Sequence, residues 1–228
     1  MTLVLVAHGT RDPAGTRVIE RIADAVRARL PMVPVSVAYA DVCQPRLSAV
    51  LGGTPPGPCV VMPAFLASGY HVRVDLPTEI AASGRPGVKV TPALGADPGV
   101  VAAAHDRLLA AGWRSGDAVV FVAAGSSNQD ALNEVRRAAT MLALRVGAPV
   151  HQAYVTTAQP SVPRVVAGLR ARGRRIAVAS WLLAPGLFHR AVAAAEPDVV
   201  AAPLGAHPRV VDVIVRRYLS ARCYQAAA

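Results

Sequence analysis

The chain of 228 residues has few aromatic side chains, few cysteines and few acidic groups. Only 4% of its residues are aromatic, and its basic residues, almost all arginine, are scattered along the chain. This composition disfavours a nucleic-acid-binding surface, which needs clustered basic residues and stacking rings. The 14 acidic residues stand against 24 basic ones, and the resulting net charge of +10 favours some other anionic partner.

The cysteine count also excludes whole classes of protein. Cys43, Cys59 and Cys223 are an odd number without close paired spacing. The sequence therefore predicts reduced thiols, and neither a disulfide framework nor a zinc knuckle.

No segment has the composition of a membrane-spanning helix. The long uncharged stretch between Arg46 and Arg73 contains Pro55, Pro56, Pro58 and Pro63, which a spanning helix would not accommodate. The chain starts directly with an apolar run, without a basic lead or a small-residue cleavage site, so we expect no secretory signal and a cytoplasmic location. A hydrophobic fraction of 53% indicates a well-buried globular core.

Eight apolar runs of strand length alternate with longer segments of helical period. The runs are Leu3–Ala7, Val33–Tyr39, Cys59–Met62, Val88–Thr91, Ala118–Ala123, Val150–Tyr154, Arg175–Ser180 and Val199–Ala201. Because these runs are continuously apolar, they are typical of parallel strands that helices cover on both faces. The sequence therefore predicts an α/β fold.

The two groups of four runs are copies of one another, because short peptides recur in the same order at a nearly constant offset. The clearest matches are Val4–Gly9 with Val120–Gly125, Ala38–Pro45 with Ala153–Pro160, Leu66–His71 with Leu183–His189, and Leu94–Pro98 with Leu204–Pro208. We expect two βα subdomains, 1–114 and 115–228, each with a four-stranded, mainly parallel sheet flanked by helices. Ligands of such sheets bind beyond the carboxyl ends of the strands, so the prediction includes a ligand cleft between the halves.

Three side chains with metal-binding or proton-transferring capacity follow strands of the first half. They are His8, Asp41 and, in the loop expected after the third strand, His71. Two imidazoles and a carboxylate make an open site for a divalent first-row metal and can also move protons. The second half has Ala124 and Thr156 at the places of His8 and Asp41 and retains only His189. The chemistry is therefore expected in the first half.

Each of these residues also has a structural interpretation. A lone histidine at a strand end is commonly hydrogen-bonded for structural reasons, Asp41 could cap a helix that begins near Gln44, and His71 could be solvated. The remaining histidines and one aspartate are expected to be structural or to lie at helix caps: His105, His151, His207 and Asp97.

Two glycine turns between strand and helix, at Gly9 and Gly125, could present backbone N–H groups to an anion. Neither turn matches a P-loop or a G-x-G-x-x-G fingerprint, so nucleotide binding is disfavoured. Two interpretations stay open for these turns. One is a substrate carboxylate at the turns, and the other is helix capping by Thr10, Asp12, Ser127 or Asn128.

Three segments resemble the signature segments of the sirohydrochlorin chelatases, the class II, ATP-independent enzymes that insert cobalt or iron into a tetrapyrrole. They are Leu3–Pro13, Val37–Pro45 and Pro63–Pro77. The resemblance implies that His8 and His71 hold the metal and accept the pyrrole protons. It places Asp41 where the family usually has glutamate as a metal ligand, so the carboxylate arm is one methylene shorter.

The resemblance also implies the partners of the site. The expected substrates are the carboxylate-rich tetrapyrrole sirohydrochlorin and Fe2+ or Co2+, with Ni2+ as a further candidate, in sirohaem or cobalamin synthesis. No permanently bound cofactor and no nucleic acid or membrane partner is expected, and the chain is a monomer or a homodimer. The alternative is a non-catalytic module that binds a small anion or a tetrapyrrole. Residues expected to bind the substrate are Thr10, Arg11, Arg73, Ser126, Ser127, His189 and Arg190.

Overall fold

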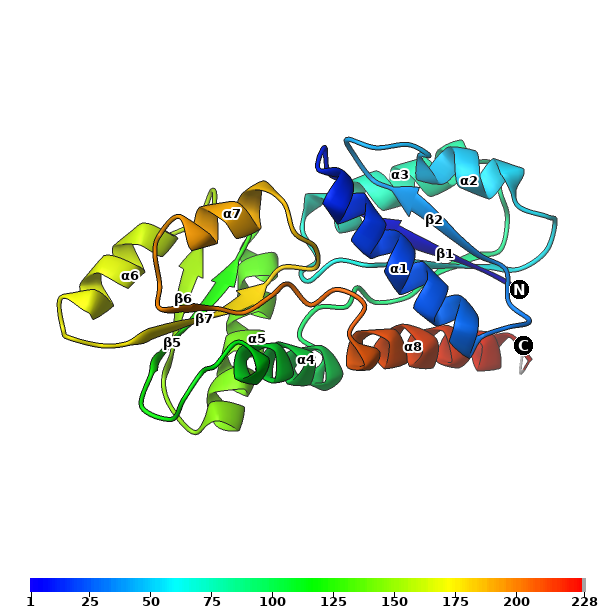
Figure 1. Cartoon of the computed structure of the whole chain (residues 1–228). Coiled ribbons are helices and arrows are strands. Elements are labelled where there is room, and N and C mark those ends of the chain that lie inside the picture. The colour runs from blue at the N-terminus through cyan, green and yellow to red at the C-terminus, as the bar shows by residue number, and fades with distance from the viewer. Residues whose placement is uncertain (227–228) are drawn as a thin grey trace. The chain divides into compact units, whose positions relative to one another are not determined.

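The computed structural model describes residues 1–226, which form two compact α/β units (Figure 1). The first unit contains Met1–Leu94 and the described residues from Gly205 onward, and the second contains Gly95–Leu204. All eight predicted strands are present, in two four-stranded parallel sheets. The predicted fold class is therefore confirmed, and each unit is described by itself below.

The sheet of the first unit has the strand order β2-β1-β3-β4. Its strands are β1 (Thr2–Ala7), β2 (Val35–Tyr39), β3 (Cys59–Pro63) and β4 (Val88–Val90). Every residue of β1 is buried, as its continuous apolar run predicts for a central parallel strand. Ala7 pairs with Tyr39 and Val6 with Pro63, so the carboxyl ends of these three strands meet at one edge of the sheet.

Helices cover both faces of this sheet. They are α1 (Pro13–Arg29), α2 (Leu47–Gly53), the π-helix η1 (His71–Asp75), α3 (Leu76–Ala82) and α8 (Pro208–Ala226). Helix α1 begins with the Asp12 carboxylate accepting from the Ala14 N–H at 2.9 Å, and its apolar face, which includes Val18, Ile22 and Val26, is buried. An ion pair of 2.6 Å between Arg29 and Asp212 joins α1 to α8.

The second unit repeats this design with the strand order β6-β5-β7-β8. Its strands are β5 (Ala118–Ala123), β6 (Val150–Tyr154), β7 (Ile176–Trp181) and β8 (Val199–Val200). Its helices are α4 (Pro98–Ala110), α5 (Gln129–Val146), α6 (Val162–Arg170) and α7 (Leu187–Ala193). No helix within residues 1–226 is both long and apolar enough to cross a bilayer.

Several predictions about single side chains are confirmed. The Asp97 carboxylate caps α4 by accepting from the Gly99 N–H, and the His207 ring nitrogen accepts from the Arg209 N–H at the start of α8. The His105 ring packs edge-on against the Trp113 ring, with 6.1 Å between centroids. The three cysteines are free thiols.

The compact units differ from the predicted halves 1–114 and 115–228 by the exchange of one helix each. Helix α4 belongs to the first sequence repeat but packs against α5 and β7 of the second unit. Helix α8 belongs to the second repeat but packs against α1 and β3 of the first unit. A helical period shows that a helix has an apolar face, but it does not show which sheet that face will cover.

The repeat extends to the backbone of the glycine turns. Gly9 and Gly125 have φ angles of +96° and +104°, and a Cβ at these places would stand 2.1 Å from the Asp41 carbonyl oxygen and 1.9 Å from that of Thr156. The N–H of Asp41 donates to the His8 carbonyl, and the N–H of Thr156 donates to the Ala124 carbonyl. Only glycine permits this close approach at a positive φ.

Candidate active site

The structure brings two of the predicted site residues together at the carboxyl edge of the first sheet. His8 directly follows β1, and His71 is the first residue of η1. Their ring centroids are 4.4 Å apart, with an angle of 75° between the ring planes. The two imidazoles are therefore in edge-to-face contact.

The prediction of a loop around His71 is wrong, because this residue lies in a helix. The N–H groups of Val72 and Arg73 donate to the Gly69 carbonyl, and the Leu76 N–H donates to the His71 carbonyl. The last bond spans five residues, which defines a π-helical turn, a form often found at functional sites. The turn continues directly into α3 and fixes the His71 backbone.

Asp75 is a site residue that the sequence analysis missed. Its Oδ2 lies 2.5 Å from Nδ1 of His71. A carboxylate on one ring nitrogen fixes the orientation of an imidazole and leaves the other nitrogen, here Nε2, for a metal. The sequence did contain a signal for the contact between Asp75 and His71. The two residues are four positions apart, a spacing that brings side chains together on a helix.

The surroundings of His8 favour its neutral form. Partial removal of water from the ring and the neighbouring His71 lower the pKa of His8 below its ordinary value of 6.5. A neutral imidazole has a lone pair for a metal and can accept a proton. Both capacities are those that the sequence predicts for this residue.

Asp41 is held at the same edge of the sheet by its backbone, but its carboxylate is exposed and turned to its own loop. Its Oδ1 accepts from the Val42 N–H at 2.8 Å and lies 4.0 Å from Nη1 of Arg46. The Val42 hydrogen bond lowers the pKa of Asp41, and positive charge on His8 and His71 adds to this effect.

Asp41 does not cap a helix, because α2 begins at Leu47 without a side-chain cap. Among residues 1–226, no three His, Cys, Asp or Glu side chains are grouped to hold one metal ion. The structure thus pairs the two histidines, while Asp41 as a third ligand stays a prediction.

Arg46, which follows the Asp41 loop, is engaged by Glu79 of α3. The Glu79 carboxylate accepts from Nη2 of Arg46 and from the Ser48 N–H, both at 3.0 Å. Hydrogen bonds from Ser48 and Arg46 lower the pKa of Glu79. These hydrogen bonds join the start of α2 to α3.

Two aromatic rings lie near the histidines, and exposed apolar side chains occur in the same segments. The Phe65 ring lies 6.5 Å from the His71 ring at an interplanar angle of 25°, and the Tyr70 ring lies 6.2 Å from His71. Tyr70 is 64% exposed, and Val42 and Val74 also present large exposed apolar surface. Exposed apolar side chains are therefore found in the Asp41 loop, just before η1 and within η1.

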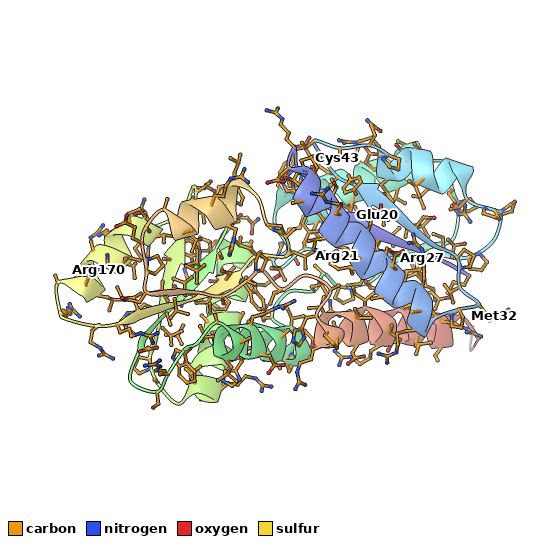
Figure 2. The ribbon with its side chains drawn as sticks, viewed as in Figure 1. Glu20, Arg21, Arg27, Met32, Cys43 and Arg170 are labelled. Carbon is orange, nitrogen blue, oxygen red and sulfur yellow. The ribbon has the colours of Figure 1, made fainter. Side chains whose placement is uncertain are left out.

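The polar residues predicted to bind substrate in the first unit have different surroundings. The Thr10 hydroxyl accepts from the Asp12 N–H, and the Thr10 N–H donates to Sγ of Cys43, which lies near the start of α1 (Figure 2). Thr10 therefore supports the turn before α1. Arg11 and Arg73 are exposed, and Nε of Arg73 donates to the Ser68 carbonyl.

The predicted substrate-binding residues of the second unit are not tested by its geometry. The Ser126 hydroxyl accepts from the Asn128 N–H, and the Asn128 side chain caps α5, so the capping interpretation explains this turn. Nε2 of His189 lies 3.2 Å from the Ala201 carbonyl. Ser127 and Arg190 are exposed, and their role stays a prediction.

A duplicated parallel α/β fold with paired imidazoles at one sheet edge defines a chelatase-type protein. The CbiX family model matches residues 2–111 and 118–221. The chain belongs to the CbiX family, and the predicted membership of the sirohydrochlorin chelatases is confirmed.

Known relatives agree with this assignment. The chain is 36% identical over 80 residues to the sirohydrochlorin cobaltochelatase of Methanopyrus kandleri, a match that covers 34% of this chain and 56% of the relative. The chain thus spans little more than half the length of the curated relatives it matches.

Two solved structures share the fold. SirB from Bacillus subtilis with Fe3+ has a TM-score of 0.79 at 22% identity, over 96% of this chain and 94% of that one. CbiX, described as the terminal enzyme of siroheme biosynthesis in denitrifying bacteria, has a TM-score of 0.73 at 24% identity, over 97% and 99%.

Proposed function

We propose that this protein inserts a divalent metal ion into sirohydrochlorin without ATP. The observation that carries the proposal is the pair of imidazoles, His8 and His71, whose ring centroids lie 4.4 Å apart at the carboxyl edge of the first sheet of a CbiX family chain. This pair has no counterpart in the second repeat, where Ala124 stands at the place of His8. The metal is a substrate of the reaction and leaves with the product.

Metal insertion releases two protons, which the two histidines can accept. The tetrapyrrole loses two pyrrole protons while the divalent ion gains nitrogen ligands and gives up its water and protein ligands. His8 is suited to accept a proton because its surroundings favour the neutral ring in the resting site. For His71, the Asp75 carboxylate at Nδ1 would stabilise the imidazolium that forms when Nε2 takes up a proton.

The surroundings of the histidines suggest how the macrocycle is held. Tyr70, Val74 and Val42 offer exposed apolar surface to its ring face. The carboxylates at its edge would pair with Arg11 and Arg73, whose guanidinium groups can bind them in bidentate fashion. Ser126, Ser127, His189 and Arg190 of the second unit are kept as candidates for further carboxylate contacts.

The proposal also concerns which metal ion is inserted. One relative is named for cobalt, one related structure holds Fe3+, and another is described as an enzyme of siroheme biosynthesis. Imidazole and carboxylate ligands accept several first-row ions, so geometry and supply decide between them. We propose Fe2+ or Co2+, with sirohaem or a cobalamin precursor as the product.

The test is a spectrophotometric assay of the purified full chain with sirohydrochlorin and Fe2+, Co2+ or Ni2+ in separate reactions. The expected result is metal-dependent conversion of the tetrapyrrole spectrum that His8→Ala abolishes. Saturable binding of sirohydrochlorin without conversion by any of the three metals would overturn the proposal in favour of a non-catalytic binding module. Conversion at an equal rate by His8→Ala would remove this residue from the mechanism.

A further inference from the structure

The second unit contains a cavity of about 690 Å3 whose lining includes neither His8 nor His71. It is open to solvent and is lined by the edge strand β6, by α5 and by the loops that follow β5 and β6. This volume is in the range that accommodates a small organic molecule. The lining residues are Ser126, Ser127, Leu132, Arg136, Val150, His151, Gln152, Tyr154, Thr157, Ala158, Gln159 and Pro160.

The internal repeat shows which of these residues are particular to the second unit. The buried faces of α1 and α5 align at an offset of 116, which places Arg136 where α1 has Glu20. The pairing of β2 and β6 with their central strands places His151 and Gln152 where β2 has Ser36 and Val37.

These exchanges change both the charge and the polarity of the surface. An arginine replaces a glutamate, and a glutamine replaces a valine that is buried in the first unit. The lining contains no carboxylate, whereas Glu20 would place one there in the first unit. The second unit has therefore built a polar, positively charged cavity at a place where its copy is acidic and apolar.

Several polar groups that line the cavity can donate hydrogen bonds. Nη1 of Arg136 donates to Oδ1 of Asn133 at 2.5 Å, which holds the guanidinium along α5 and leaves Nη2 and Nε for a ligand. The Tyr154 hydroxyl donates to Oε1 of Gln152 at 3.3 Å, so the amide nitrogen of Gln152 is the end that can donate to a ligand. The hydroxyl of Ser127, exposed at the start of α5, can donate as well.

We propose that this cavity binds a small organic anion whose carboxylate or phosphate group pairs with Arg136. A guanidinium held beside neutral donors is the arrangement that recognises either group. Leu132, Val150 and Pro160 would contact the apolar body of such a molecule. The proposal does not depend on metal insertion, because Arg136 and these three apolar residues have no part in the proposed chelatase reaction.

The experiment is calorimetric titration of the full chain with citrate and, separately, with inorganic phosphate, at fixed ionic strength. The expected result is saturable binding of one of the two, which Arg136→Gln weakens at least about tenfold. Arg137→Gln is the matched control, since it removes the same charge from the next residue of α5, which is exposed and outside the cavity. If both variants weaken anion binding equally, the anion is attracted only by the net charge and the proposal is overturned. The proposal is also overturned if neither citrate nor phosphate binds saturably.

A second set of variants tests the cavity without removing a charge. His151→Ser and Gln152→Val install the residues of the first repeat, which the same strand position tolerates there. Both are expected to weaken binding of the anion while the rate of metal insertion stays unchanged. Sirohydrochlorin competing with citrate would assign the cavity to the tetrapyrrole and overturn a separate site. Failure of the chelatase assay with binding intact would overturn only the proposed function.

Discussion

Replacing Gly9 by alanine tests how the turn after β1 (Thr2–Ala7) positions His8. The new Cβ would stand 2.1 Å from the Asp41 carbonyl oxygen, on a backbone with φ of +96°. An L-residue with a left-handed backbone costs roughly 1–2 kcal/mol. Overpacking against an immobile neighbour adds roughly 1–3 kcal/mol. The expected loss in the free energy of unfolding is therefore about 2–5 kcal/mol, relieved in part by displacement of the Asp41 loop.

The second repeat provides a matched control. Gly125→Ala meets the Thr156 carbonyl oxygen at 1.9 Å with φ of +104°, so its cost in stability should be similar. Ala124 and Thr156 carry no proposed chemistry, however, so only Gly9→Ala should also lose metal insertion beyond what its unfolded fraction explains.

Denaturant unfolding followed by circular dichroism, and the sirohydrochlorin assay at a temperature where both variants are folded, measure the two effects. A Gly9→Ala protein within about 0.5 kcal/mol of the parent would refute the steric argument, since that is the scatter of neutral surface substitutions. Equal losses of insertion by both variants would refute the assignment of the chemistry to the first unit.

Three further predictions concern the site. His8→Ala and His71→Ala should each abolish metal insertion. His189→Ala should reduce the insertion rate only modestly, because Nε2 of His189 faces the Ala201 carbonyl. Comparable losses of rate in all three variants would contradict a metal site confined to the first unit. Asp75→Asn should slow metal insertion at least about tenfold with little change in the affinity for the tetrapyrrole. An unchanged kcat would show that Asp75 does not position His71 for the reaction. Because the pKa of His8 is lowered from its ordinary value of 6.5, the acid limb of the rate profile governed by His8 should lie below pH 6.5. A limb above pH 6.5 would contradict the lowered pKa.

The strands, the repeat and the first-unit histidines could be predicted from the amino-acid sequence. Continuous apolar runs predict buried parallel strands, since only a sheet covered on both faces removes every side chain of a strand from water. The repeat followed from matched peptides, and it predicted Ala124 as the inactive counterpart of His8. Residues that end parallel strands must lie at one edge of the sheet, so the meeting of His8 with the segment after β3 (Cys59–Pro63) was predictable.

Which helix covers which sheet, and which side chains complete the site, could not be predicted from the sequence and became visible in the folded chain. Helices α4 (Pro98–Ala110) and α8 (Pro208–Ala226) each pack in the unit opposite to their own repeat. The contact of Asp75 with His71 depends on a helical turn where the sequence suggested a loop. The orientation of Asp41 and the cavity at Arg136 depend likewise on side-chain rotamers and loop closure. The local pattern of apolar residues indicates which face of a helix or strand is buried. The directions of side chains and the distances between them are set by packing among segments far apart in the chain.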